Sequence, residues 1–196
     1  MPSRPFHHGN LRAELLERAR VTLRETGEEG VSLRQLARDV GVSHAAPRRH
    51  FPDRQQLLLA LAEQGFTELT ATITESVNRS GGGADAVFRA VARSYVDFAR
   101  GDAALMNLMF SAKNHEAAAD VAGAAERFFA VTGSLLQQVA PDSAVRIPDR
   151  SRLQLLLAAT LHGIASLAGT GRIGEAQVGV LIEDAGSLFG VADAQK

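Results

Sequence analysis

The sequence of 196 residues contains no cysteine. This absence excludes disulfides, thiolate zinc sites and cysteine nucleophiles, and it fits a reducing compartment, so we expect a cytoplasmic protein. Long apolar runs are also missing, because no uninterrupted run approaches the roughly 18 residues of a membrane span. The N-terminal segment "MPSRPFHHGN" lacks the apolar centre of a signal peptide. We therefore expect no association with a membrane.

Net charge is small, at −1, but it is unevenly distributed. Residues 1–55 contain ten arginines against seven acidic residues, whereas residues 56–196 contain eleven basic and fifteen acidic residues. A basic N-terminal part followed by an acidic remainder suggests an anionic partner for the first part. On charge alone, a chance distribution is the commoner explanation.

Strand-like alternation of apolar and polar residues is absent, and apolar residues recur at helical spacing along almost the whole chain. We therefore predict an all-α fold of about nine helices. The segment "SGGGAD", residues 80–85, predicts a flexible loop or hinge. The predicted helices are residues 10–26, a second helix between Ser32 and Gly41, then residues 44–50, 53–78, 85–100, 103–113, 116–140, 150–169 and 175–190.

The second predicted helix has the clearest start signal. Ser32 stands at the N-cap with Gln35 three residues later, which is the spacing of a capping box, and Val31 and Leu36 have the spacing of a hydrophobic staple. Gly41 is expected to end this helix. In the same way, Asp53 and Gln56 predict the start of the long fourth helix.

The stretch "SHAAPRRHF", residues 43–51, contains a proline inside an apparent helix. With Ser43 as N-cap, Pro47 would be the fourth residue of a short helix that runs from His44 to His50, and proline is tolerated best in the opening turn. At about 100° per residue, one face of this helix is cationic and the other mostly apolar. The cationic face holds His44, Ala45, Arg48 and Arg49, and the other face holds Ala46, Pro47, His50 and Phe51.

A helix, the turn "VGVS" and a second short helix have the spacing of a helix-turn-helix. The second helix of such a pair enters the DNA major groove. A solvated charge run on a helical hairpin is the alternative. The capping signal, Gly41, the flat basic face and the charge asymmetry together favour DNA binding.

Residues 9–56 resemble the tetracycline-repressor (TetR) family. The resemblance rests on a first helix and glycine loop, then "SLRQLARDVGVS", a short helix that ends in "HF", and "PDRQQLL". The remaining chain is similar, more weakly, to the WHG subtype of the family's C-terminal domain. Its marks are "YVDFA" (95–99), "LMNLMF" (105–110) and "LHGIASL" (161–167), where Leu161 replaces the usual tryptophan.

This resemblance implies a homodimeric transcriptional regulator, usually a repressor, that binds a palindromic operator in double-stranded DNA. A helix-turn-helix head of three helices (residues 9–55) would be joined by the fourth helix to a helical ligand-binding and dimerisation domain (residues 56–192). Arg54 matches a position that a phosphate-contacting lysine usually fills, and Arg48 replaces a usual tyrosine, so its role at base or phosphate stays open. The implied DNA-binding residues are Ser32, Arg34, Ser43, His44, Ala45, Arg48, Arg49, His50 and Arg54.

The C-terminal part predicts two further surfaces. Broad apolar stripes on the last two helices suit either a monomer core or the dimer interface that the resemblance favours. Aromatic and methionine side chains in the middle helices suit an ordinary core or a pocket for a small, mostly apolar effector, with Tyr95 or His162 as its polar group. The predicted interface residues are Leu153, Leu157, Leu161, Ile164, Val178, Leu181, Ile182, Ala185 and Phe189. The predicted pocket residues are Tyr95, Phe98, Leu105, Met106, Met109, Phe110, Phe128, Phe129 and His162.

Catalytic and metal-binding motifs are missing from the sequence. "HEAAAD", residues 115–120, has no second histidine at the spacing of a zinc-protease helix, and no phosphate-binding glycine loop or nucleophile elbow is present. We therefore expect no enzyme activity, no metal and no cofactor. A helical interaction or architectural module without sequence-specific DNA binding remains the rival to a transcriptional regulator.

Overall fold

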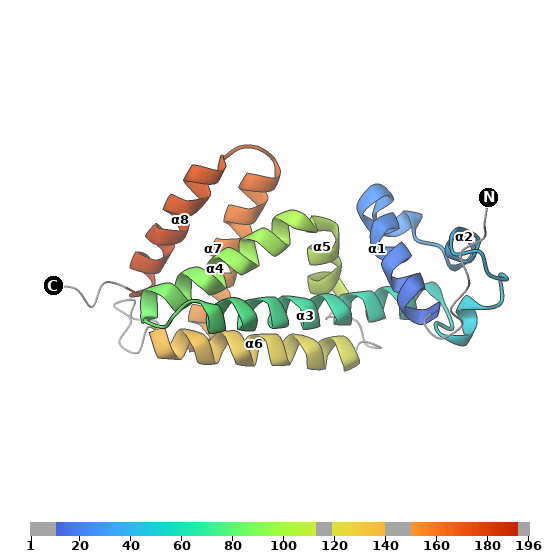
Figure 1. Ribbon diagram of the computed structural model, residues 1–196, viewed down its shortest axis with the longest axis horizontal. Coiled ribbons are helices and arrows are strands. Elements are labelled where there is room, and N and C mark those ends of the chain that lie inside the picture. Colours follow the sequence, from blue (N-terminus) through green and yellow to red (C-terminus); the bar gives the residue numbers. More distant parts are fainter. Residues whose placement is uncertain (1–10, 113–118, 140–149, 192–196) are drawn as a thin grey trace. The chain divides into compact units, whose positions relative to one another are not determined.

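The computed structural model describes residues 11–112, 119–139 and 150–191, and the segment between the predicted helices 116–140 and 150–169 lies outside them. The described residues form eight α-helices and one 3-10 turn and contain no strand, which confirms the all-α prediction (Figure 1). No helix in this part of the chain combines the length and apolarity needed to cross a bilayer. The elements are α1 (Leu11–Gly30), α2 (Leu33–Asp39), η1 (Pro47–Arg49), α3 (Arg54–Arg79), α4 (Ala84–Gly101), α5 (Ala103–Ala112), α6 (Ala119–Val139), α7 (Arg150–Gly169) and α8 (Glu175–Leu188).

The chain divides into two compact units. The first comprises residues 1–65 and 104–122, and the second comprises residues 66–103 and 123–196. Helix α3 therefore contributes to both units, as do α5 and α6. The predicted domain limits, 9–55 and 56–192, stay predictions.

Glycine interrupts the first helix where the sequence predicts its end. Gly27 has φ 73° and ψ −176°, outside the helical region, and Glu28 to Gly30 then form one more helical turn. The non-helical segment expected between residue 26 and Ser32 is therefore shorter than predicted. At the start of α3, the backbone N–H of Gln56 donates to Asp53 Oδ1 at 2.8 Å, so Asp53 is the expected N-cap.

The core of the first unit is formed by apolar faces of α1, α2 and α3 and by α5. Leu15, Leu36 and Leu57 have no exposed surface. Gly65 in α3 allows α5 to approach closely, since a Cβ there would lie 2.6 Å from the Met109 Sδ. Gly65 and Met109 therefore bring α3 and α5 into close contact within the first unit.

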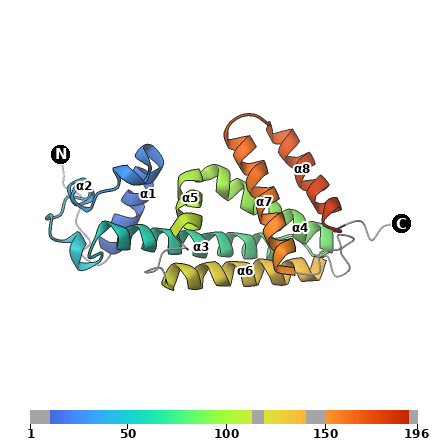
Figure 2. The same cartoon turned by 180° about the vertical axis from the view of Figure 1, so that it is seen from behind.

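The second unit is organised around α4, which contacts both α7 and α8. The buried face of α4 carries Phe88, Ala92 and Val96, and Gly186 on α8 leaves room for the Phe88 ring. Ion pairs join the rim of this contact, including Arg100 Nη1 to Glu175 Oε2 at 2.7 Å. Figure 2 shows α7 and α8 side by side as an antiparallel pair.

Candidate nucleic-acid interface

Helix α2 ends in a turn that only glycine adopts without strain. Gly41 has φ 75°. Its N–H donates to the Arg38 carbonyl at 3.1 Å, and the Val42 N–H donates to the Ala37 carbonyl at 2.9 Å. These two bonds form the Schellman arrangement, which satisfies the last carbonyls of the helix. Gly41 therefore ends α2 as the sequence predicts and turns the chain toward η1.

The predicted capping box at the start of α2 is wrong. Ser32 is the N-cap residue, but its side chain forms no capping hydrogen bond. The Gln35 side chain faces the other way along the helix, because its Nε2 donates to Asp39 Oδ1 at 2.6 Å and its Oε1 accepts from Arg38 Nη2 at 2.7 Å. Val31 and Leu36, the predicted staple, are both buried.

The predicted α-helix from His44 to His50 is also wrong. Residues 44–46 form a turn, and only Pro47 to Arg49 form a single 3-10 turn, η1. Proline has no N–H to donate to the Ser43 carbonyl, so that carbonyl accepts from the Ala46 N–H at 3.0 Å instead. Pro47 becomes the first residue of the shorter helix rather than its fourth.

The two faces of this segment nevertheless separate as the sequence predicts, except that His50, which is expected on the mostly apolar face, is exposed. Pro47 and Phe51 are buried and anchor the segment to the head. The predicted DNA-binding residues are all exposed, with the exception of Arg54. The exposed ones are Ser32, Arg34, Ser43, His44, Ala45, Arg48, Arg49 and His50.

The arginines of the head divide into two groups by their partners. Arg18 on α1 pairs with Asp39 on α2 at 2.8 Å, and Arg38 donates to Gln35. In contrast, Arg34, Arg48 and Arg49 form no ion pair and no side-chain hydrogen bond with any other residue that the structure describes. These three guanidinium groups are therefore free to bind an external anion.

Asp39 joins the first two helices. The hydrogen bond from Arg18 and a second one from Gln35 hold the pKa of Asp39 below its usual value. The carboxylate therefore remains charged at neutral pH and fixes α2 against α1. This contact sets the orientation of the helix that carries Arg34.

Arg54 has a structural function that the sequence did not indicate. Its Nε donates to the Val31 carbonyl at 3.0 Å, and its Nη2 donates to the Glu28 carbonyl. The side chain is half-buried and joins the start of α3 to the segment between α1 and α2. Its predicted phosphate contact stays a prediction, and part of its donor capacity is already in use.

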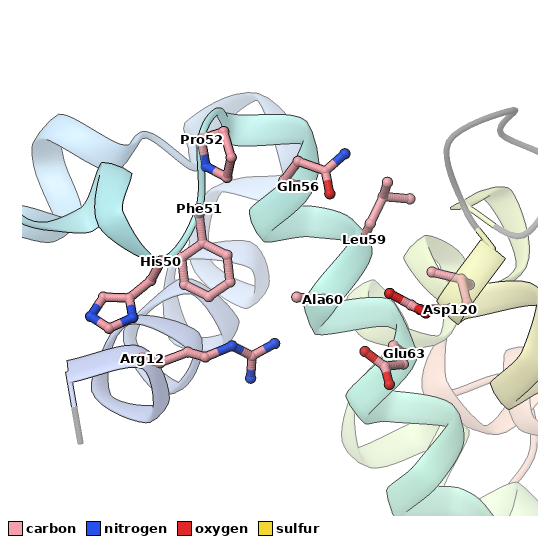
Figure 3. Close-up of a pocket in the computed structure, with 10 residues that line it drawn as sticks. Arg12, His50, Phe51, Pro52, Gln56, Leu59, Ala60, Glu63 and Asp120 are labelled. Carbon is pink, nitrogen blue, oxygen red and sulfur yellow. The ribbon is translucent and has the colours of Figure 1, made fainter. Parts of the chain in front are cut away.

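A polar cavity of about 130 Å³ lies within the first unit (Figure 3). Arg12 and Asp120 contribute to its wall from α1 and α6, and the Arg12 guanidinium lies 5.4 Å from the centre of the Phe51 ring. No local sequence pattern predicts this cavity, because its wall combines residues more than 100 positions apart. The remaining lining residues are His50, Pro52, Gln56, Leu59, Ala60, Glu63 and Val121.

A second cavity, of about 30 Å³, lies within the second unit. It brings together three of the predicted pocket residues, Tyr95, Phe128 and Phe129. Burial raises the pKa of Tyr95 to about 12, and its hydroxyl forms no hydrogen bond with the described residues. The other lining residues are Ile73, Val91, Thr132, Gln154, Leu157, Ala158 and Leu161.

The other predicted pocket residues do not line this cavity. Leu105, Met106 and Met109 are buried in the first unit, and Phe110 is half-buried there. Phe98 is half-buried on α4, and His162 is exposed on α7. Of the two predicted polar groups, only Tyr95 therefore lies at the cavity.

The predicted interface residues lie mostly in the interior of the single chain. Leu157, Leu161, Ile164, Val178, Ile182 and Ala185 are buried, and Leu153, Leu181 and Phe189 are half-buried. The large apolar side chains exposed in the described residues all lie elsewhere on the same two helices. They are Leu155 (64% exposed), Leu156 (49%), Leu167 (37%), Val180 (60%) and Leu188 (70%). The apolar surface available to a partner is thus the opposite side of α7 and α8.

Metal ligands do not gather in the part of the chain that the structure describes, where no three His, Asp or Glu side chains are grouped for an ion. The described residues therefore offer cationic donors on the head, one polar cavity and one mostly apolar cavity.

Comparisons with known proteins match both parts of the chain. Residues 15–61 match the family "Bacterial regulatory proteins, tetR family", and residues 88–184 match "Tetracyclin repressor-like, C-terminal domain". The transcriptional repressor AcnR of Corynebacterium efficiens is 39% identical over 67 residues, which are 34% of this chain and 36% of that protein. The chain thus matches about a third of the length of its curated relatives.

Solved structures extend the likeness over the whole chain. A Rhodococcus sp. RHA1 protein of unknown function is 43% identical, with a TM-score of 0.82, over 95% of this chain and 97% of that one. LfrR from Mycobacterium smegmatis, a TetR-like regulator solved in complex with proflavine, is 20% identical with a TM-score of 0.69, over 91% of this chain and 96% of that one. The match to the C-terminal family does not specify the WHG subtype, which stays a prediction. With matches to both domains and helix-turn-helix geometry in the head, the chain belongs to the TetR family of bacterial regulatory proteins.

Proposed function

We propose that this protein is a sequence-specific DNA-binding transcriptional regulator, a homodimeric repressor that an effector releases from a palindromic operator. The observation that carries the proposal is the head surface itself. Arg34, Arg48 and Arg49 are exposed without an acidic partner among the described residues. The buried Pro47 and Phe51 hold the segment that carries Arg48 and Arg49 in place. The AcnR relatives, which share the match to the head, are transcriptional repressors. A regulator of this kind acts where the chromosome is, in the cytoplasm.

The exposed residues take different parts in the proposed complex. Arginine bound to guanine O6 and N7 is the commonest base-specific contact, whereas phosphate contacts set the position of the protein on the duplex. We assign base contacts to Arg34 and to one of Arg48 and Arg49. Ser32 and Arg54 position the head, and Ser43, His44, Ala45 and His50 complete the contact surface.

Selection of DNA from a random pool tests this function. The full-length protein should enrich one palindromic sequence, because two symmetry-related heads read two half-sites separated by about one helical turn, roughly 34 Å. Binding to the enriched sequence should exceed binding to scrambled DNA by about 1,000-fold or more at the same salt concentration. Salt-dependent binding without any enriched sequence would instead support the architectural module and contradict the regulator.

The dimer that we propose uses the exposed side of α7 and α8. An apolar patch of this kind on a single chain indicates a protein contact. Small exposed residues between the large ones, Ala159, Gly163 and Ser166, allow the helices of a second copy to approach closely. A twofold axis through this patch brings α7 and α8 of one subunit against α7 and α8 of the other.

The effector site that we propose is the cavity beside Tyr95. Its volume of about 30 Å³ is near that of a single water molecule, so an effector must displace side chains to enter. Thr132 and Gln154 already bond to each other at 2.8 Å, which leaves the Tyr95 hydroxyl as the available polar group. This chemistry suits a mostly apolar, aromatic compound with one hydrogen-bond acceptor, and LfrR, which shares the fold, was solved in complex with the aromatic compound proflavine. Effector release requires tighter binding to the DNA-incompetent state than to the competent one.

A panel of aromatic compounds that includes proflavine tests the effector site by melting temperature and operator affinity. For a compound that binds, Tyr95→Phe should weaken affinity about 5- to 10-fold, because one hydrogen bond is lost. His162→Gln should leave affinity unchanged, since His162 is exposed and outside the cavity. A panel in which no compound alters either quantity would contradict the pocket, and equal loss in both variants would contradict the assignment to Tyr95.

A further inference from the structure

The polar cavity of the first unit is not used by the proposed DNA contact or by the effector site. All ten lining residues belong to that one unit, and they come from α1, the segment after η1, α3 and α6. At about 130 Å³ it is larger than the cavity beside Tyr95. It approaches the size of an apolar cavity of about 150 Å³ that holds benzene, so it can admit a molecule of similar size.

Basic and acidic side chains line opposite sides of this cavity. Figure 3 shows Arg12 and His50 on one side and Glu63 and Asp120 on the other. Neither Arg12 nor Asp120 has an ion pair or a side-chain hydrogen bond with any residue that the structure describes. The Arg12 guanidinium instead lies over the face of Phe51, a contact that holds its position and leaves its N–H donors available. Arg12 and Asp120 are thus two ionic groups that face a common space without neutralising each other.

Apolar side chains separate the two charged sides. Phe51, Leu59 and Val121 are buried lining residues, and Figure 3 shows Ala60 between Arg12 and the acidic side chains. A ligand that fits this surface needs a charged group at each end and a short apolar segment between them. A simple anion would be attracted by Arg12 and repelled by Asp120, whereas a simple cation would be attracted by Asp120 and repelled by Arg12.

We propose that this cavity binds a small zwitterion of the amino-acid class. Its carboxylate pairs with Arg12, where the guanidinium can donate two parallel hydrogen bonds, and its ammonium group pairs with Asp120. The methylene chain between them lies beside Phe51 and Ala60. Bound in this way, the ligand connects the first turn of α6 to α1 of the head.

Isothermal titration of the full-length protein without DNA tests the proposal at low salt and neutral pH. The probes are glycine, β-alanine, 4-aminobutanoate and 5-aminopentanoate, which place the two charges at increasing separations. Pentanoate and butylamine serve as probes of similar size with a single charge. At least one zwitterion should bind, and it should bind at least about tenfold more tightly than either singly charged compound, a difference of about 1.4 kcal/mol.

Variants locate the binding. Arg12→Gln and Asp120→Asn should each weaken the zwitterion at least about tenfold, because each removes one charged contact. Arg127→Gln and Glu126→Gln are matched controls, exposed on α6 and outside the cavity, and should leave affinity unchanged. Unchanged melting curves would show that the variants fold normally.

Three results would overturn the proposal. They are the absence of binding by every zwitterion at millimolar concentrations, equal binding of pentanoate or butylamine, and affinity that neither Arg12→Gln nor Asp120→Asn reduces. Because no DNA is present in the titration, failure here leaves the proposed regulatory function untouched. Failure of the DNA selection would likewise leave this site untouched.

Discussion

Arg34→Ala should lower affinity for the selected operator about 10- to 100-fold and relax the base preference at one position of each half-site, because a bidentate contact to guanine contributes about 1–3 kcal/mol of discrimination. Either Arg48→Ala or Arg49→Ala should likewise lower affinity and relax base preference at one position of each half-site. The other should weaken binding by a similar factor on all sequences and reduce the salt dependence by about one unit of slope per subunit, about two for the dimer, as expected for a phosphate contact. Operator and scrambled duplexes, titrated at several salt concentrations, separate these outcomes.

Arg38→Ala is the matched control for this prediction. Arg38 is exposed on the same helix as Arg34, but its guanidinium already donates to Gln35 at 2.7 Å. It should therefore lose much less affinity than Arg34→Ala. If Arg48→Ala and Arg49→Ala both leave affinity and base preference unchanged, neither side chain contacts DNA and the assigned interface is wrong. That result would also remove any role for Arg48 at the position where the family usually has tyrosine.

The double substitution Leu155→Glu and Val180→Glu should convert the protein to a monomer at micromolar concentration and weaken operator binding at least about 100-fold. Both side chains are more than half exposed in the single chain, so the new charges leave its core intact. In a symmetric interface each charge would be buried twice without a partner, at a cost of about 3 kcal/mol or more for each. Sedimentation velocity gives the oligomeric state, and the operator titration gives the affinity.

Two controls distinguish this surface from the interior of the chain. Ala71→Glu places a charge on an exposed position of α3 and should leave both the oligomeric state and the melting temperature unchanged. Leu161→Ala should lower the stability of the chain by about 2–5 kcal/mol, because Leu161 is buried in it. A Leu155→Glu, Val180→Glu protein that sediments as a dimer would place the interface elsewhere, and a wild-type monomer would contradict the proposed dimer altogether.

Local signals in the sequence succeeded where a single residue imposes a backbone conformation. Gly27 leaves the helical region and Gly41 adopts a positive φ, so both breaks lie where the sequence places them. Asp53 caps α3 because its carboxylate needs only a backbone N–H three residues away. The capping box predicted at Ser32 does not form, because the Gln35 side chain donates to Asp39 instead. Arg18 of α1 holds Asp39 in place. Competition from a distant residue decided this case.

Pro47 is tolerated in an opening turn as predicted, but the predicted α-helix around it does not form. Proline in the opening turn is tolerated, but the lost N–H also removes the bond that would have closed an α-helical turn on Ser43. The Ser43 carbonyl accepts a hydrogen bond from the Ala46 N–H instead, and the helical part of the segment is limited to the 3-10 turn η1. The exposed cationic surface survived this change, because burial of Pro47 and Phe51 fixes which side of the segment meets solvent.

The sequence by itself determined the all-α fold, the approximate limits of the helices, the helix-turn-helix and the basic surface of the head, because helical periodicity, glycine and charge are local properties. Only the tertiary structure decided which arginines are free, since Arg18 and Arg38 differ from Arg34 in their neighbours and not in their chemistry. It also decided which side of α7 and α8 is exposed. Both helices are apolar around most of their circumference, so periodicity cannot choose the buried side, and packing against α4 makes that choice. The cavity between Arg12 and Asp120 exists for the same reason, because distant residues share a space only after the helices have packed.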